Sequence, residues 1–315
     1  MRHFLGIDDL SSGELLAVLD RADDLKGQRA AALFEGRSPV ADVLHGRSVA
    51  LVFEKPSMRT RASFEVAVHE LGGKALPMWD AEIGLGRREA IADTGAVLSR
   101  YVQAIVIRTF GQERITELAE AASVPVVNAL TDLEHPCQAL ADLQTLREAH
   151  GSLHGRALAY VGDGNNVAHS LLLAGAKVGL SVRLGHPEGY GPEADVVARA
   201  HELAAESGAE LLVTTDPVEA VTGADAVYTD VWASMGQEDE AHARAGVFAP
   251  FQVTPELLAH AADGAVLLHC LPAHRGEEVA AEVIDGPASR VFDQAENRLH
   301  AQKALLATLL ADGEA

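Results

Sequence analysis

The sequence is poor in cysteine and has no long apolar run. Among its 315 residues there are only two cysteines, Cys137 and Cys270. Because they are few and far apart, they argue against a disulfide-stabilised scaffold and favour a reducing compartment. No apolar run approaches the length of a membrane span, and the first residues lack the apolar segment of a secretion signal. We therefore expect a cytoplasmic protein that is not bound to a membrane.

Basic residues are also scarce. There are 25 Lys and Arg against 46 Asp and Glu, which gives a formal net charge of -21. Nucleic acids and anionic membrane surfaces would repel such a chain, so we exclude them as partners. A cationic or zwitterionic small molecule fits better, and a local basic pocket can still bind an anion.

What the chain does contain is a series of apolar runs between helical patterns. Runs that are continuous rather than alternating are typical of parallel strands covered on both faces. With 48% hydrophobic residues, the chain is long enough for two cores. We predict the α/β class, with two domains that are each a parallel sheet flanked by helices. The predicted strands are 49–53, 104–107, 124–127, 157–161, 178–184, 211–215, 226–229 and 265–269.

A helical pattern over 136–150 and a polar turn at 151–155 separate the two series of strands. We place the first domain at 1–148 and the second at 149–292. The helical pattern at 295–310 has no strand after it, and we expect the segment 293–315 to pack back onto the first domain. Because parallel sheets bind ligands at the carboxyl ends of their strands, we predict the active site in the cleft between the domains.

The segment Ser57-Met58-Arg59-Thr60-Arg61 lies between an apolar run and a helical pattern. Backbone N–H groups at a helix N-terminus favour an anion, and hydroxyl and guanidinium groups add donors for phosphate oxygens. The alternative is an N-cap serine or threonine with solvated arginines. Arg108 comes directly after another predicted strand and would lie at the same edge of the sheet.

His135-Pro136-Cys137-Gln138 opens the long helical pattern, with proline at a position where its missing N–H costs nothing. A histidine there can donate to a carbonyl oxygen that gains negative charge, and a glutamine amide can bind a neutral amide. A zinc site at His135 and Cys137 would need further ligands, so we expect no metal.

Three segments of the second half follow predicted strands. Gly162-Asp163-Gly164-Asn165-Asn166 resembles a dinucleotide-binding turn, but Val167 replaces the third glycine; alternatively, its asparagines could bind a carboxylate. Asp230 could bind an amine or serve as a turn residue. His269-Cys270-Leu271-Pro272 places a thiol at a strand end, without an adjacent base to activate it as a nucleophile.

Together, these segments resemble the ornithine carbamoyltransferase family over nearly the whole chain. Residues 53–61 look like the carbamoyl phosphate loop of that superfamily and 135–138 like its H-P-x-Q, while 230–236 and 269–272 resemble its ornithine elements. The resemblance implies transfer of a carbamoyl group to ornithine, a step of arginine metabolism, by a homotrimer or an assembly of trimers without cofactor. It implies that carbamoyl phosphate is bound by Ser57, Met58, Arg59, Thr60, Arg108, His135, Gln138, Cys270, Leu271 and Arg298, and ornithine by Asn166, Asp230, Ser234 and Met235. Of these, Arg108, His135, Asp230 and Cys270 would act in catalysis.

The chain departs from the family pattern at two places. Met58 replaces the usual threonine, which should matter little if that position contributes mainly its backbone. In the loop that a neighbouring subunit lends to the site, Gly84 stands where the family often has glutamine or histidine. We expect Arg87 or Arg88 to replace that contact. Three alternatives to this function stay open. They are a related carbamoyltransferase that acts on putrescine, N-acetylornithine or aspartate, a nicotinamide dehydrogenase, and a non-catalytic relative.

Overall fold

The protein is described here by a computed structural model of residues 3–233 and 241–311. Contacts along the backbone divide the chain into two compact units. Unit 1 comprises residues 1–144 and 297–315, and unit 2 comprises residues 145–296. Among the described residues, none of the helices combines the length and the hydropathy of a membrane span.

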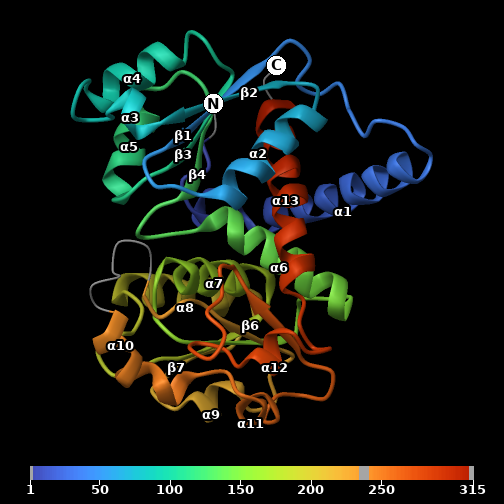
Figure 1. Ribbon diagram of the computed structural model, residues 1–315, viewed down its shortest axis with the longest axis vertical. Helices are drawn as coiled ribbons and strands as arrows, with labels where there is room; N and C mark the ends of the chain where they lie inside the picture. The colour runs from blue at the N-terminus through green and yellow to red at the C-terminus, as the bar shows by residue number, and fades with distance from the viewer. Residues whose placement is uncertain (1–2, 234–240, 312–315) are drawn as a thin grey trace. The chain divides into compact units, whose positions relative to one another are not determined.

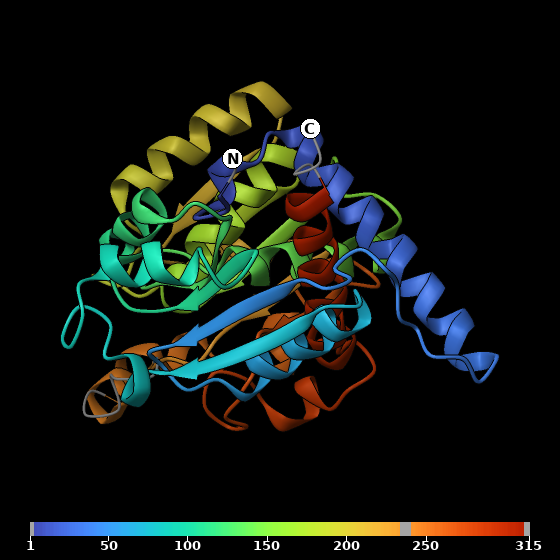
Figure 2. The ribbon, with the colours of Figure 1, turned by 90° about the horizontal axis from the view of Figure 1, so that it is seen from above.

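Unit 1 is built on a four-stranded parallel sheet in the order β2-β1-β3-β4. Figure 2 shows β1 and β2 as neighbouring arrows that point the same way. Every residue of β3 and β4 is buried, which explains why their sequences are apolar except at Arg108 and Asn128. The strands are β1 (Ser48–Phe53), β2 (Lys74–Trp79), β3 (Ala104–Arg108) and β4 (Val126–Leu130).

Two helices of unit 1 begin where a serine side chain satisfies a free backbone N–H group. Ser11 and Glu14 form a capping box at α1, and Ser57 caps α2. Helix α6 begins in unit 1, and α13 ends in it. These elements are η1 (Ile7–Asp9), α1 (Ser12–Phe34), α2 (Met58–Glu70), α3 (Asp80–Ile83), α4 (Ile91–Leu98), α5 (Gln112–Ala121), α6 (Pro136–His150) and α13 (Val291–Ala311) (Figure 1).

Unit 2 contains a five-stranded parallel sheet in the order β7-β6-β5-β8-β9. Helix α7 contacts β6, and α9 contacts β5, β6 and β7. The strands are β5 (Ala157–Val161), β6 (Ser181–Gly185), β7 (Leu211–Thr214), β8 (Ala226–Thr229) and β9 (Val266–His269). The helices are α7 (Asn166–Val178), α8 (Ala194–Ser207), α9 (Pro217–Val221), α10 (Ala241–Phe248), η3 (Ala249–Phe251), α11 (Pro255–Leu258) and α12 (Ala281–Ile284).

The predicted fold class, two parallel sheets flanked by helices, is confirmed. Each predicted strand overlaps an observed one, but the prediction of a strand from 178 was wrong. Val178 ends helix α7, and Gly179 in a left-handed conformation turns the chain into β6. Strand β2 was missed because it contains Pro77 and is only partly buried. Proline is tolerated there because β2 is an edge strand.

Two glycines in helix interiors have opposite surroundings. At Gly175 in α7, an added Cβ would lie 2.5 Å from Cγ2 of Val182 and 3.1 Å from the carbonyl oxygen of Leu180. The absence of a side chain therefore lets α7 pack closely on β6. At Gly27 in α1, nothing lies within 4 Å of such a Cβ.

We predict that the same substitution has opposite effects at these two sites. Gly175→Ala should destabilise the protein by about 1–3 kcal/mol, because the extra methyl group overpacks a filled contact. Gly27→Ala should stabilise it by about 0.5–1 kcal/mol, because alanine is the better helix former. Thermal unfolding of both variants beside the parent tests this. A melting temperature that rises in Gly175→Ala would contradict the close packing of α7 on β6.

Candidate active site

The segment Ser57 to Arg61 forms the N-terminus of α2, with three residues between it and the end of β1. The Ser57 hydroxyl accepts a hydrogen bond from the Thr60 N–H at 3.3 Å and donates to the Thr60 hydroxyl at 2.9 Å. The N-cap interpretation of Ser57 is therefore correct, and the cap sits at the positive end of a helix dipole. Met58, the first residue of α2, is 67% exposed. The N-terminus of a helix is a position at which backbone N–H groups favour an anion.

Of the two arginines in this segment, only Arg61 has a partner within residues 3–233 and 241–311. Arg61 lies 3.7 Å from Glu65 one turn further along α2 and stands over the Trp79 ring. Arg59 is half-buried and forms no ion pair with a described residue. Arg59 is therefore the guanidinium that can bind a ligand at this turn.

Arg298, on the part of α13 that belongs to unit 1, connects two of the predicted segments. Its Nη2 donates to Oγ1 of Thr60 at 2.9 Å, and its Nη1 donates to Oε1 of Gln138 at 2.9 Å. The Gln138 amide in turn donates to Asp142 at 2.7 Å. Thr60, Gln138 and Arg298 are all at least 96% buried. The first turns of α2 and α6 are thus joined by one guanidinium group.

His135 directly precedes α6, and its carbonyl accepts the N–H groups of Gln138 and Ala139. Burial, and after it the positive charges of Arg298 and Arg108, hold the pKa of His135 well below its ordinary value. His135 is therefore neutral near pH 7, and a neutral imidazole offers one N–H donor. Arg108 is the last residue of β3 rather than the residue after it, and its carbonyl accepts the Glu54 N–H at 2.9 Å.

Cys137 has a structural role. Its thiol is fully buried and donates to the carbonyl of Asn128 at 3.2 Å. Burial raises the pKa of this thiol to about 12, although the charge of Arg298 acts in the opposite direction. Because a metal binds the thiolate, a cysteine that keeps its proton is a poor ligand. The chemistry of His135 and Cys137 does not suit zinc.

The loop after α3 explains why Gly84 is a glycine. Gly84 adopts a left-handed conformation with φ of 57° and caps α3, and an added Cβ would lie 2.8 Å from Cγ of Arg88. A larger residue would be strained there. Arg87 is an exposed side chain that forms an ion pair with Asp80, which raises the pKa of its guanidinium through hydrogen bonding and charge.

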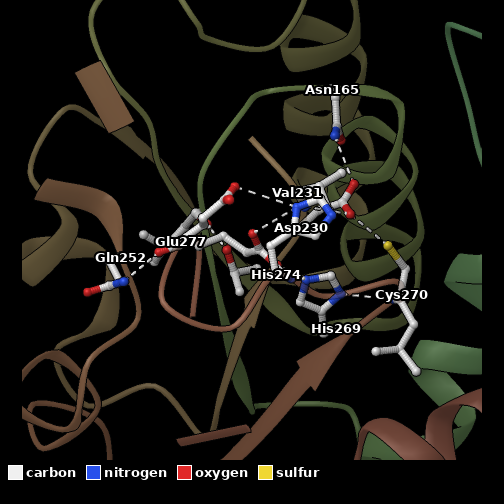
Figure 3. A network of polar contacts seen from close by, with 12 residues as sticks. Asn165, Asp230, Val231, Gln252, His269, Cys270, His274 and Glu277 are labelled. Carbon is white, nitrogen blue, oxygen red and sulfur yellow. Dashed lines mark hydrogen bonds and ion pairs between the residues drawn. The ribbon is translucent and has the colours of Figure 1, made fainter. Parts of the chain in front are cut away.

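In unit 2, the Asp230 carboxylate lies between two partners from other segments (Figure 3). Asn165 Nδ2 donates to Asp230 Oδ2 at 3.0 Å, and Cys270 Sγ donates to Oδ1 at 2.9 Å. The Val231 N–H also donates to Oδ1, at 2.8 Å. The expectation that no base stands beside Cys270 was wrong, because the fold brings a carboxylate 40 positions away against its thiol.

The backbone after Cys270 is held by a buried histidine. Leu271 has φ of 58°, which is strained for a residue with a side chain, and the Leu271–Pro272 bond is cis. The Leu271 N–H donates to His269 Nδ1 at 2.9 Å, so Nε2 carries the hydrogen that faces Glu278 at 3.1 Å. Both side chains are fully buried. The same Glu278 oxygen accepts the His274 N–H at 2.6 Å. This network holds the strained turn in place.

The glycine-rich turn after β5 has a local explanation. A Cβ on Gly164 would lie 2.3 Å from the backbone nitrogen of Pro192. The close backbone at Pro192 therefore requires glycine at position 164. Asn165 accepts the N–H groups of Val167 and Ala168 and is the N-cap of α7. The Asn165 oxygen is therefore used by the cap, and its Nδ2 donates one hydrogen bond, to Asp230. Asn166, the first residue of α7, is half-buried in the same turn.

Two groups of side chains in the described part of the chain have metal-ligand atoms within 4.8 Å of one another. In Asp230, His269 and Cys270, both histidine nitrogens are already used in hydrogen bonds. A metal there would have to displace the bonds that hold Leu271. In His274, Glu277 and Glu278, the imidazole lies 3.6 Å and 3.9 Å from the two carboxylates, as expected for ion pairs.

The structure brings together some predicted residues and leaves others outside its description. In unit 1, Thr60, Gln138 and Arg298 contact each other, and Arg108 acts with Arg298 on His135. In unit 2, Asp230 contacts Cys270. Ser234 and Met235 lie outside the described residues.

Sequence reasoning missed Asn165 as a partner of Asp230 and Glu278 as a partner of His269. For Asn165, its position before a helical pattern was a usable signal of an N-cap. For Glu278, a glutamate in a polar stretch carried no signal, because charged residues are mostly exposed.

The lowered pKa of His135 predicts a pH dependence of stability. Below about pH 6.5 the unfolded chain takes up a proton that the folded chain does not, so stability falls as the pH decreases. The fall should be about 1.4 kcal/mol for each pH unit. His135→Gln should lose this part of the dependence, and His45→Gln at an exposed site should keep the profile of the parent. Thermal unfolding at a series of pH values from 7.5 to 5 measures the stability of each variant and of the parent. Parallel profiles for His135→Gln and the parent would contradict the buried neutral imidazole.

Comparison with known proteins identifies the family. Residues 2–148 match the carbamoyl-P binding domain of aspartate/ornithine carbamoyltransferases, and residues 154–309 match their Asp/Orn binding domain. An ornithine carbamoyltransferase of Parafrankia sp. is 59% identical, with 98% of this chain and 96% of that protein aligned. An ornithine carbamoyltransferase of Acidothermus cellulolyticus is 58% identical, with 98% of this chain and 97% of that protein aligned.

A solved structure agrees with these sequence matches. The ornithine carbamoyltransferase from Pyrococcus furiosus superposes with a TM-score of 0.93 at 50% identity, over 98% of this chain and 97% of the other. Both the sequence and the fold match over nearly the full length. The chain therefore belongs to the aspartate/ornithine carbamoyltransferase family.

Proposed function

We propose that the protein transfers the carbamoyl group of carbamoyl phosphate to the side-chain amine of L-ornithine, giving L-citrulline and phosphate. The observation that carries the proposal is the polar cluster of unit 1. There, buried Arg298 joins Thr60 to Gln138, and burial, followed by the charges of Arg298 and Arg108, lowers the pKa of His135 and keeps it neutral. The names of the full-length relatives, which are ornithine carbamoyltransferases, support the choice of substrate.

Carbamoyl phosphate would bind to unit 1 in an anion site at the start of α2. The capped turn offers backbone N–H groups, and Arg59 offers a guanidinium that has no partner among the described residues. Arg108, Arg298 and Thr60 complete the phosphate site, together with Ser57 and the backbone of Met58. His135 and Gln138 would bind the carbamoyl group, because one offers a neutral N–H and the other an amide.

Ornithine would bind to unit 2 beside the Asp230 carboxylate. Asp230 has a fixed orientation because Asn165, Val231 and Cys270 all donate to it. A carboxylate held in this way can bind a side-chain amine. By the family resemblance, Asn166, Ser234 and Met235 would bind the amino-acid end, and the Leu271 carbonyl would accept the carbamoyl N–H. The predicted domains 1–148 and 149–292 correspond to this division of substrates.

The reaction needs an uncharged amine, an electrophilic carbonyl and a stabilised leaving phosphate. The amine of ornithine is mostly protonated at neutral pH, by analogy with a lysine pKa of about 10.4. One of its protons must be lost to solvent before the attack. Asp230 and Cys270 would orient the neutral amine, and the departing phosphate would accept the second proton, which leaves the nitrogen once the new bond has formed. As the amine attacks, negative charge grows on the carbonyl oxygen. His135 and the arginines would stabilise this charge, and each donor is typically worth about 3–4 kcal/mol. The transfer requires no metal or cofactor.

The assembly and the location follow from the resemblance and from the sequence. We propose a homotrimer or an assembly of trimers in the cytoplasm, in which the loop that carries Arg87 and Arg88 reaches the site of a neighbouring subunit. Gly84 supports this role for the arginines, since its left-handed backbone has no side chain to offer.

An assay of carbamoyl transfer tests the proposed function. Purified protein should form citrulline from carbamoyl phosphate and ornithine, with far less product from putrescine, N-acetylornithine or aspartate. Arg59→Ala should lower kcat at least about 100-fold, because a charge-stabilising donor is lost. Arg61→Ala is the matched control, and its kcat should remain within a few fold of the parent.

Asp230→Asn should weaken ornithine binding more than carbamoyl phosphate binding in calorimetric titration. If the protein prefers another amine, the assignment of ornithine as its substrate is wrong. If Arg59→Ala keeps its activity, the assignment of the anion site to the start of α2 is wrong.

A subunit-mixing experiment tests the shared loop. Arg59→Ala and the double variant Arg87→Ala/Arg88→Ala should each be nearly inactive alone. When they are unfolded and refolded together in equal amounts, about a quarter of the sites should combine an intact Arg59 with an intact loop from the next subunit. Each variant refolded alone is the control. A mixture no more active than its components would mean that the loop acts within its own chain or that these arginines do not contribute.

A further inference from the structure

A buried ion pair connects α2 and α13 in unit 1. Lys303 Nζ donates to Glu70 Oε2 at 2.9 Å, and the two side chains are only 2% and 4% exposed. Arg29 of α1 donates to the other carboxylate oxygen of Glu70 at 2.8 Å and is 27% exposed. Burial alone would raise the pKa of Glu70, but hydrogen bonds from Arg29 and Lys303 outweigh it and the pKa is lowered. The pair is therefore charged.

This ion pair is a costly way to hold two helices together. Removing both charges from water is expensive, and well-packed apolar residues of similar volume often stabilise as much or more. Glu70 is also the last residue of α2, where a negative charge is unfavourable to the helix dipole. Stability alone does not account for a lysine and a glutamate at these positions. A directional contact, by contrast, fixes how two helices are aligned.

The same two helices carry the contact on which the anion site depends. Arg298 lies on α13 five positions before Lys303, and its Nη2 donates to Thr60 in the first turn of α2. Gln302 lies between these contacts. In the orientation that satisfies both ends of its amide, it donates to Ser63 Oγ at 2.6 Å and accepts from Arg298 Nη2 at 3.2 Å. Three polar contacts therefore align α13 with α2.

We propose that Lys303 and Glu70 are positioning residues for carbamoyl phosphate binding. They affect this binding indirectly, by holding Arg298 in place. By fixing α13 against α2, the ion pair places the Arg298 guanidinium between Thr60 and Gln138 before a ligand arrives. The proposal rests on the proposed function for the identity of the ligand. Neither residue touches the phosphate. An apolar contact in their place would preserve packing but would let α13 slide or rotate, and small displacements of a binding group reduce catalysis strongly.

Two substitutions separate positioning from stability. Lys303→Met alone leaves the Glu70 carboxylate buried with one partner fewer, and its melting temperature should fall by roughly 10 °C. In the double variant Lys303→Met/Glu70→Leu, both charges are replaced by apolar side chains, and the melting temperature should recover most of this loss. If the pair positions Arg298, the stable double variant should still show a KM for carbamoyl phosphate raised about 10-fold or more, with little change in the KM for ornithine. Its Kd for carbamoyl phosphate in calorimetric titration should rise in the same proportion.

Arg47→Met is the matched control. Arg47 Nη1 donates to the Leu310 carbonyl at 2.8 Å, so this variant removes a cationic contact to the same helix away from Arg298. It should lower the melting temperature and leave the KM for carbamoyl phosphate within about twofold. A double variant with the parental KM and Kd would overturn the proposal, and so would an equal change of KM in Arg47→Met.

A second variant covers the case in which the double variant does not fold. Glu70→Gln keeps an oxygen for Lys303 but removes the carboxylate charge, so it should weaken carbamoyl phosphate binding less than Lys303→Met does. Equal binding by both variants and the parent would overturn the proposal. If the parent binds carbamoyl phosphate but forms no citrulline, the proposed function fails, while the calorimetric comparison still tests the ion pair.

Discussion

The hydrogen bonds of Arg298 are the interaction on which the anion site of unit 1 depends. Arg298 is 4% exposed, and its guanidinium donates to Thr60 and Gln138. A buried cation is tolerated only when its donors are satisfied. The turn after β1, the start of α6 and the C-terminal helix must therefore be correctly placed for any one of them to be stable. Because of the hydrogen bonds of Arg298, the geometry of the anion site depends on how the helices and the sheet of unit 1 pack together.

The local charge of this site is opposite to that of the chain. The formal net charge is -21, yet Arg108 and Arg298 are both buried beside His135. Surface carboxylates keep such a protein soluble, and they do little to a buried site because water and salt screen them. The buried arginines act at short range instead, where their charges add to the effect of burial in lowering the pKa of His135, so that the imidazole stays neutral.

In unit 2, residues that build the fold also orient the chemical groups. Asn165 caps α7 with its oxygen and holds Asp230 with its nitrogen. His269 supports the strained Leu271 on one side and contacts buried Glu278 on the other. Asp230 and Cys270 follow neighbouring strands, β8 and β9, which the parallel sheet brings together. Their positions are thus fixed by caps and by the sheet, not by flexible loops.

The sequence by itself determined the parallel α/β architecture and the helix start at Pro136, because both depend on local periodicity and short-range signals. It offered the N-cap at Ser57 as an alternative, which short-range hydrogen bonds confirm. It did not reveal β2, whose proline and partial burial resemble a loop. Only the tertiary structure decided the contacts of the site. Arg298 meets Thr60 across 238 positions and Cys270 meets Asp230 across 40. Such contacts are set by strand order and helix packing, which a local pattern does not encode.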